Sequence, residues 1–240
     1  MRKYLMYKEL AKYYDYIYHK KDYATESKNI ISLIKRFKKS SGKELLDVAC
    51  GTGKHLQYLK KQYICTGIDL NREMLNVARC NIKGVKYYLG NMINFNLKKQ
   101  FDIITCLFSS IGYVKTYTNL ERTLKNFYKH LNTGGVLIIE PWIDKNKFYA
   151  GSSYIDTYKD NNIVIARVST SAIKGNISVL KFSYLISKND GRIYYYEDIS
   201  ELGFFDRKRT LRMMKRIGYD ARFIIGKDKK DRGVYVAVKK

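Results

Sequence analysis

The stretch LDVACGTGKH, residues 46–55, contains the first chemically specific pattern of the chain. A short apolar run stops at the acidic residue Asp47 and is followed by Gly51-Thr52-Gly53. This order predicts a β-strand that leads through a tight loop into a helix. Such a loop usually holds a nucleotide-like ligand, so the residues around it have to show which one.

Short apolar runs alternate with helical segments through the first 140 residues. The predicted strands are 44–48, 64–68, 85–89, 101–107 and 135–140, and the predicted helices are 22–39, 53–61, 71–81 and 117–131. This alternation is typical of βαβ units and of a mostly parallel sheet with both faces covered.

The sequence pattern changes after residue 144, and β-branched and aromatic residues dominate up to residue 205. Turn signals at 174–176 and 188–191 divide this region into antiparallel meander strands. A helix at 206–217 and strands at 219–225 and 233–238 return the chain to the sheet. We therefore expect a Rossmann-like, doubly wound α/β sheet of seven strands. Its core is predicted over 1–141 and 206–240, and the antiparallel β insertion over 142–205.

Composition limits the possible classes of protein. A chain of 240 residues with 45% hydrophobic content can bury the core of one domain. No stretch approaches the roughly 18 apolar residues that span a bilayer, and the N-terminal residues lack the apolar core of a signal peptide. We expect a cytoplasmic protein without a membrane partner. The four cysteines stand singly, which predicts buried free thiols and no metal site.

The formal net charge is +24, from 46 Lys and Arg against 22 Asp and Glu. Such an excess fits either a nucleic-acid partner or an anionic small substrate. The basic residues are scattered along the chain rather than gathered in an arm. This distribution weakens the nucleic-acid interpretation without removing it.

The glycine loop does not have the dinucleotide spacing G-x-G-x-x-G. The stronger signal is Asp69, sixteen residues after Gly53, at the end of the second predicted strand. A carboxylate there can accept hydrogen bonds from both hydroxyls of a ribose. The tripeptide GNM, residues 90–92, ends the third strand, where an adenine ring would lie.

Together, these three strand ends resemble the class I S-adenosylmethionine-dependent methyltransferases. The resemblance implies that the loop passes under the methionine part of the cofactor, that Asp69 holds the ribose and that Asn91 contacts the adenine amino group. Asn91 stands where the family usually has Asp, but its amide oxygen can still accept. The implied cofactor is S-adenosylmethionine, with S-adenosylhomocysteine as product. Its expected contacts are Tyr14, Asp47, Ala49, Gly51, Gly53, Asp69, Leu70, Asn91, Met92 and Leu107.

A narrower resemblance covers nearly the whole chain. The stretches AKYYDYIYHKKDYATES, LLDVACGTGKHL, FDIITCLFSSIGYV, GGVLIIEPW and DRGVYVAVKK look like the N,N-dimethyltransferases that finish deoxyaminosugars such as mycaminose and desosamine. Those enzymes act on a sugar amine attached to dTDP, and their meander insertion forms the floor of the sugar-nucleotide site. The resemblance therefore implies an anionic sugar nucleotide as acceptor, and a homodimer, which is common in the family.

The resemblance also implies two catalytic positions. Tyr18 matches a tyrosine that lies beside the amine, and Tyr113 stands where the family has a histidine. A histidine with a pKa near 6.5 shuttles protons at neutral pH, whereas a tyrosine near 10 is a poor acceptor. Either water removes the ammonium proton, or the substrate differs from that of the family. Alignment of the amine with the activated methyl group provides the rest of the catalysis.

The acceptor side requires groups for a diphosphate and a sugar. Arg232 matches the family's phosphate-binding arginine, and Arg167 in the meander is a second candidate, because a guanidinium pairs well with phosphate oxygens. Trp142, the only tryptophan, is expected to wall the pocket. Ser109 and Ser110 end the fourth strand and are expected to hydrogen-bond the sugar.

Three other functions remain open. An RNA methyltransferase would explain the charge, but exocyclic-amine methylators of nucleic acid usually carry an Asn/Asp-Pro-Pro-aromatic motif where this chain has LFSSIG. An N-methyltransferase of another small amine, such as glycine or a polyamine, predicts no affinity for dTDP. A noncatalytic cofactor-binding protein is disfavoured by the intact loop and Asp69.

Overall fold

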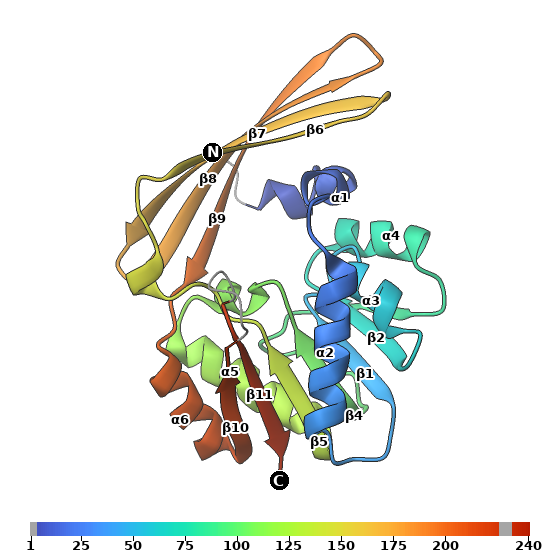
Figure 1. Cartoon of the computed structure of the whole chain (residues 1–240), viewed down its shortest axis with the longest axis vertical. Coiled ribbons are helices and arrows are strands. Elements are labelled where there is room, and N and C mark those ends of the chain that lie inside the picture. The colour runs from blue at the N-terminus through green and yellow to red at the C-terminus, as the bar shows by residue number, and fades with distance from the viewer. Residues whose placement is uncertain (1–3, 226–231) are drawn as a thin grey trace.

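A computed structural model describes residues 4–225 and 232–240, and its strands form two sheets (Figure 1). The larger sheet has seven strands in the order β10-β11-β5-β4-β1-β2-β3. β11 runs antiparallel to β5 and β10, and the other neighbours are parallel. The doubly wound sheet predicted from the alternation is confirmed. Its strands are β1 Glu44–Val48, β2 Ile64–Asp69, β3 Lys86–Leu89, β4 Phe101–Cys106, β5 Leu131–Ile139, β10 Tyr219–Ile224 and β11 Val234–Lys239.

Five helices flank this sheet, close to the predicted ranges. They are α2 Tyr23–Phe37, α3 Lys54–Leu59, α4 Arg72–Asn81, α5 Tyr117–His130 and α6 Arg207–Ile217. Three of them begin at a side chain that accepts a hydrogen bond from the backbone N–H three residues later: Asp22, Thr116 and Asp206. Such caps satisfy N–H groups that have no partner inside the helix.

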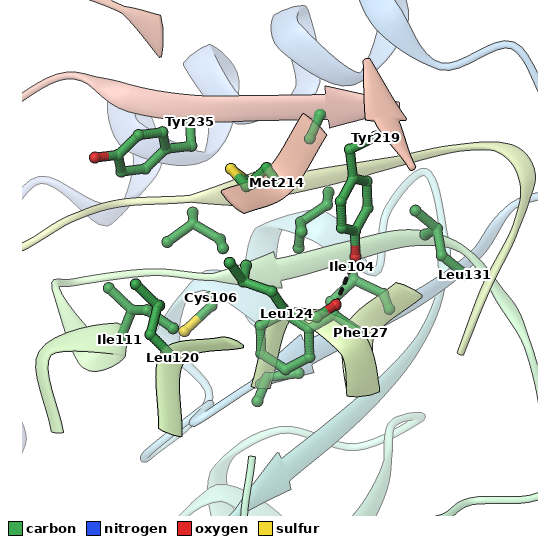
Figure 2. Close-up of a cluster of buried hydrophobic side chains, with 14 of the residues drawn as sticks. Ile104, Cys106, Ile111, Leu120, Leu124, Phe127, Leu131, Met214, Tyr219 and Tyr235 are labelled. Atoms are coloured by element: carbon green, nitrogen blue, oxygen red, sulfur yellow. Dashed lines mark hydrogen bonds between the residues drawn. The ribbon is translucent and has the colours of Figure 1, made fainter. Parts of the chain in front are cut away.

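The core lies on both faces of β4, whose six residues are all buried. Alternate side chains of a strand point to opposite faces, so Ile103 packs beneath α2 while Ile104 packs beneath α5 and α6. Figure 2 shows the second of these clusters, in which the Tyr219 hydroxyl donates to the Leu124 carbonyl at 3.1 Å. Burial on both faces explains why β4 is a continuous apolar run.

The smaller sheet is an antiparallel meander in the order β6-β7-β8-β9. Its strands are β6 Ser153–Lys159, β7 Ile163–Lys174, β8 Ile177–Lys188 and β9 Ile193–Gly203. The last three were expected from the alternating pattern. β6 was not, because this edge strand pairs only with β7 in the described sheet and most of its side chains are exposed, so it carries little apolar signal.

The N-terminal segment lies between the two sheets (Figure 1). It contains the 3-10 helices η1 Leu5–Tyr7 and η2 Ala11–Tyr13 and the short helix α1 Tyr14–Ile17. Its buried side chains join a cluster with Met74 of α4 and Tyr184 of β8. Asp198 of β9 is fully buried and accepts hydrogen bonds from the backbone N–H groups of Leu5, at 2.7 Å, and Met6, at 3.3 Å. The segment is therefore packed against α4 and against the second sheet.

Some local expectations were wrong. β5 begins at Leu131, four residues before the predicted start at 135, because the chain passes from α5 into the strand with a register irregularity opposite Phe101 and Ile103. Cys80 is exposed on α4, although its thiol was expected to be buried. Within the described residues, no helix combines the length and apolar character needed to cross a membrane.

Candidate active site

The glycine loop joins β1 to α3 in a left-handed backbone conformation that is strained for most residues other than glycine. Ala49, Gly51 and Gly53 have φ angles of 59°, 57° and 79°. A Cβ atom on Gly53 would lie 3.0 Å from side-chain atoms of Ile82 and Tyr87. The loop therefore requires glycine both for its left-handed backbone and for its close approach to neighbouring elements.

The Asp69 carboxylate at the end of β2 supports this loop. One oxygen accepts from Gly51 N–H at 2.9 Å and the other from Asn71 N–H at 2.8 Å. Burial raises the pKa of Asp69, and these backbone hydrogen bonds oppose the shift. The carboxylate is thus fixed at the carboxyl end of β2, at the edge of the sheet where ligands of such sheets bind.

A second acid, Asp47, lies beneath the loop. It is buried, and its carboxylate accepts from the Thr105 hydroxyl of β4 at 2.7 Å. Burial raises the pKa of Asp47 to about 6. Asp47 therefore ties β1 to β4 below the loop, and its contact with a cofactor stays a prediction.

The chain turns sharply after β4, where Phe108 and Ser109 have φ angles of 50° and 61°. Both residues are left-handed although neither is glycine, which is a strained arrangement that is common at functional sites. Phe108 N–H donates to a Glu140 carboxylate oxygen at 2.7 Å, and the Ser109 hydroxyl donates to the Pro141 carbonyl at 2.8 Å. Glu140 and Pro141, the two residues that follow β5, therefore hold the turn after β4 in place.

Four tyrosines meet beside this turn. The Tyr18 ring lies 5.1 Å from the Phe108 ring and 4.6 Å from the Tyr14 ring. Tyr7 and Tyr113 face each other with ring centroids 5.7 Å apart, and their hydroxyls are hydrogen-bonded. The Tyr7 ring also lies 6.1 Å from the Tyr14 ring, so the two pairs form one cluster that contains the predicted Tyr18 and Tyr113. Tyr7 was missed by sequence reasoning.

Both members of the hydroxyl pair are half-buried. Burial is the main cause that raises the pKa of Tyr7 well above its ordinary value, and it also raises the pKa of Tyr113, against the hydrogen bond from Tyr7. Raised values keep both phenols protonated at neutral pH. The pair can orient a polar group, but it cannot act as a phenolate base.

The predicted acceptor residues form two groups. Arg232 donates to the Ser109 hydroxyl at 2.6 Å and its guanidinium lies 4.8 Å from the centre of the Trp142 ring. Arg167 lies 5.2 Å from the centre of the Tyr18 ring and pairs with Asp156 at 3.4 Å. Both arginines are therefore connected through side chains to the end of β4.

Comparisons with known proteins agree with this geometry. The family described as "Methyltransferase domain" matches residues 45–135. The chain is 31% identical to the dTDP-3-amino-3,6-dideoxy-alpha-D-glucopyranose N,N-dimethyltransferase of Streptomyces fradiae, over 91% of this chain and 86% of that protein.

The chain therefore belongs to the methyltransferase family that includes the dTDP-aminosugar N,N-dimethyltransferases. The crystal structure of Streptomyces venezuelae DesVI has a TM-score of 0.88 and 30% identity, covering 96% of this chain and 98% of DesVI. The structure of S-adenosylmethionine-bound CalS10, an amino pentose methyltransferase from Micromonospora echinaspora, has a TM-score of 0.81 and 28% identity, covering 92% of each chain. The predicted S-adenosylmethionine-dependent enzyme is confirmed.

The residues of the methyltransferase fit the nucleoside part of this cofactor. Leu70 and Leu89 are 63% and 52% exposed at the ends of β2 and β3, beside the buried Asp69. The exposed apolar side chains can pack against the face of an adenine ring, and the fixed carboxylate beside them can accept hydrogen bonds from a ribose. The Asp69 oxygen that accepts from Gly51 N–H has a further lone pair for a hydroxyl, whereas the other oxygen accepts from both the backbone N–H and the side-chain amide of Asn71. We assign these residues to the nucleoside on this ground.

The remaining predicted cofactor residues are placed less directly. The Asn91 amide oxygen accepts from Ile93 N–H at 3.0 Å, and Met92 packs partly against the core. Leu107 is buried in the cluster beneath α2. Ser110 begins the 3-10 helix η3, Ser110–Val114, and is half-buried. For the described residues, no group of three His, Cys, Asp or Glu side chains could hold a metal ion.

Asp69→Asn should weaken S-adenosylhomocysteine binding about 10- to 100-fold, because hydrogen bonds to charged groups contribute about 1.5–3 kcal/mol. Titration calorimetry measures this loss. Asp102→Asn is a matched control, since Asp102 is also a buried acid that accepts a backbone N–H, from Glu44, at the opposite end of the strands. An equal loss in both variants would contradict the assignment of Asp69.

Proposed function

We propose that this enzyme transfers the methyl group of S-adenosylmethionine to the amino group of a small molecule, in particular a dTDP-linked aminodeoxysugar. The observation that carries the proposal is the extent of the similarity. It continues past the methyltransferase domain at 45–135, so that the sugar N,N-dimethyltransferase relatives match 91–95% of the chain, including the second sheet. We propose 142–205 as the substrate-binding insertion on the core formed by 1–141 and 206–240.

Arg232 and Trp142 support a sugar-nucleotide site. The guanidinium forms a rigid fork of donors that suits diphosphate oxygens, and its contact with Ser109 places it at the end of β4. Trp142 is held in place because its indole N–H donates to the Ser178 hydroxyl of β8 at 2.9 Å. We propose that these residues bind the nucleotide part, with Arg167 on the sugar side near Tyr18.

The proposed chemistry consists mainly of alignment. When bound, S-adenosylmethionine supplies an activated methyl group. The tyrosines shield the amine from water, and the Tyr113 hydroxyl oxygen, which is hydrogen-bonded to the Tyr7 hydroxyl, accepts an N–H of the amine. This contact directs the nitrogen lone pair away from Tyr113. Because Tyr113 stays neutral, the amine loses its ammonium proton to water before alignment.

The pH profile of the reaction should therefore follow the amine. We expect kcat/KM to rise with pH up to the pKa of the acceptor amine, with no tyrosine inflection below about pH 10, since burial raises the pKa of Tyr113. Tyr113→Phe should keep the same midpoint and lower the plateau about 3- to 10-fold, which is the effect of one neutral hydrogen bond. A shifted midpoint in this variant would show that Tyr113 titrates.

The acceptor is tested by titrating dTDP, with UDP as control, into protein saturated with S-adenosylhomocysteine at physiological salt. We expect dTDP-selective binding that falls about 10- to 100-fold in Arg232→Ala, because charge-assisted hydrogen bonds are lost. Arg222→Ala is the control, since Arg222 is an arginine of β10 paired with Asp220. Binding of S-adenosylhomocysteine without any dTDP binding would favour another small amine as acceptor.

The net charge of +24 supports RNA as a second acceptor class. A gel shift with bulk tRNA at increasing salt examines it directly. Retention of tRNA at physiological salt, together with absent dTDP binding, would replace the sugar-nucleotide proposal.

We also propose a homodimer formed through the second sheet. The strand register places Ile155, Val168, Leu185 and Tyr195 on the face opposite Asp156, Arg167 and Tyr184, and all four are exposed. Leu185→Lys should convert a dimer to a monomer in light scattering, because a charge would be buried at the interface. Ile225→Lys, at an exposed residue just after β10, is the control. A monomeric parent protein would refute the dimer.

A further inference from the structure

The ammonium of Lys21 is largely buried beside the active-site turn. Lys21 lies in the link between α1 and α2, and its side chain is 12% exposed. The nitrogen donates to Glu26 and lies 4.2 Å from the centre of the Phe108 ring. Burying an ammonium costs several kcal/mol unless it is paired, so this position is a specific feature of the fold.

Two sets of contacts locate this charge between the glycine loop and β4. The other oxygen of Glu26 lies 2.9 Å from the His55 ring nitrogen, and His55 is in the first turn of α3, directly after the loop. On the other side, Phe108 begins the left-handed turn after β4, which pairs with β1. The ammonium is therefore held at the ends of β1 and β4.

This location lies along the path of the cofactor's amino-acid tail. Asp69 and Leu70 fit the nucleoside at the ends of β2 and β3, and the sheet order is β4-β1-β2-β3. The reacting methyl group must reach the tyrosine cluster beside Phe108. A tail that continues from the ribose toward that cluster crosses the end of β1 and approaches the end of β4. It carries an α-carboxylate.

We propose that the Lys21 ammonium binds the α-carboxylate of S-adenosylmethionine and that Glu26 positions it for this contact. An ammonium has three N–H donors, and Glu26 accepts one of them. The Phe108 ring limits where the ammonium can move, so it is preorganised for an incoming anion. This inference rests on the cofactor of the family and not on the identity of the acceptor.

The neighbouring lysine provides a matched control. Lys20 is 69% exposed at its side chain and pairs with Asp156 of β6 at 2.7 Å. Consecutive lysines of the link thus face different parts of the molecule, and only Lys21 has the contacts that join the loop and the turn. Replacing each with Met removes one positive charge from the same link.

The experiment compares two ligands in calorimetric titrations. S-adenosylhomocysteine carries the amino-acid tail, whereas 5′-methylthioadenosine keeps the nucleoside and the sulfur but lacks the tail. Lys21→Met should weaken S-adenosylhomocysteine binding about 10- to 100-fold, as expected for a lost charge-assisted contact, and leave 5′-methylthioadenosine binding unchanged. Lys20→Met should change neither.

Equal losses for both ligands would overturn the proposal, because they would mean that Lys21 only supports the shape of the site. Unchanged S-adenosylhomocysteine binding would overturn it as well. If Lys21→Met does not fold, Lys21→Gln removes the charge while keeping a donor for Glu26, and the same selective loss is expected. No acceptor enters these titrations, so a wrong sugar assignment would appear only in the dTDP experiment.

Discussion

The left-handed turn at Phe108 and Ser109 is the constraint on which the arrangement of the site depends. Two consecutive left-handed residues without glycine cost on the order of 1–3 kcal/mol each, so the turn requires support from elsewhere. Glu140 supplies a charge-assisted hydrogen bond to Phe108 N–H, and the Pro141 carbonyl accepts from Ser109. The turned backbone then directs the Phe108 ring toward Tyr18 and Lys21, and the Ser109 hydroxyl toward Arg232. One turn therefore connects the cofactor side of the site with the proposed acceptor side.

The N-terminal segment is held by the second sheet at its start and by the glycine loop farther along. Asp198 of the second sheet accepts the N–H groups at the start of the segment, while Asp15 accepts from the Thr52 hydroxyl of the glycine loop at 2.7 Å. This packing leaves Tyr7 and Tyr113 half-buried, and desolvation raises the pKa values of both. Because both phenols stay protonated, neither can act as a base. The proposed chemistry therefore depends on alignment and on an amine that is already neutral.

Much of the fold and half of the site follow from local sequence patterns. The alternating segments, the glycine loop and Asp69 were predictable because each depends on residues close together in the chain or on the common end of parallel strands. β6 was missed because its exposed side chains leave no apolar pattern. Tyr7, Lys21 and Glu140 were missed for another reason. Tyr7 meets Tyr113 across 106 residues and Glu140 meets Phe108 across 32, so only the tertiary structure shows these pairs.

The distribution of charge at the site argues for an anionic acceptor more directly than the net charge does. Two cations near the site already have an acidic partner: Lys54 pairs with Asp15 at 3.2 Å and Arg167 with Asp156 at 3.4 Å. Within the described residues, the contacts of Arg232 are with a hydroxyl and an indole ring, which orient the guanidinium without neutralising it. A guanidinium oriented by a hydroxyl and a ring is directed toward one position, whereas charges scattered over a surface favour no single site for a phosphate. The position of Arg232, rather than the total of +24, is therefore the electrostatic feature that favours a nucleotide-linked substrate.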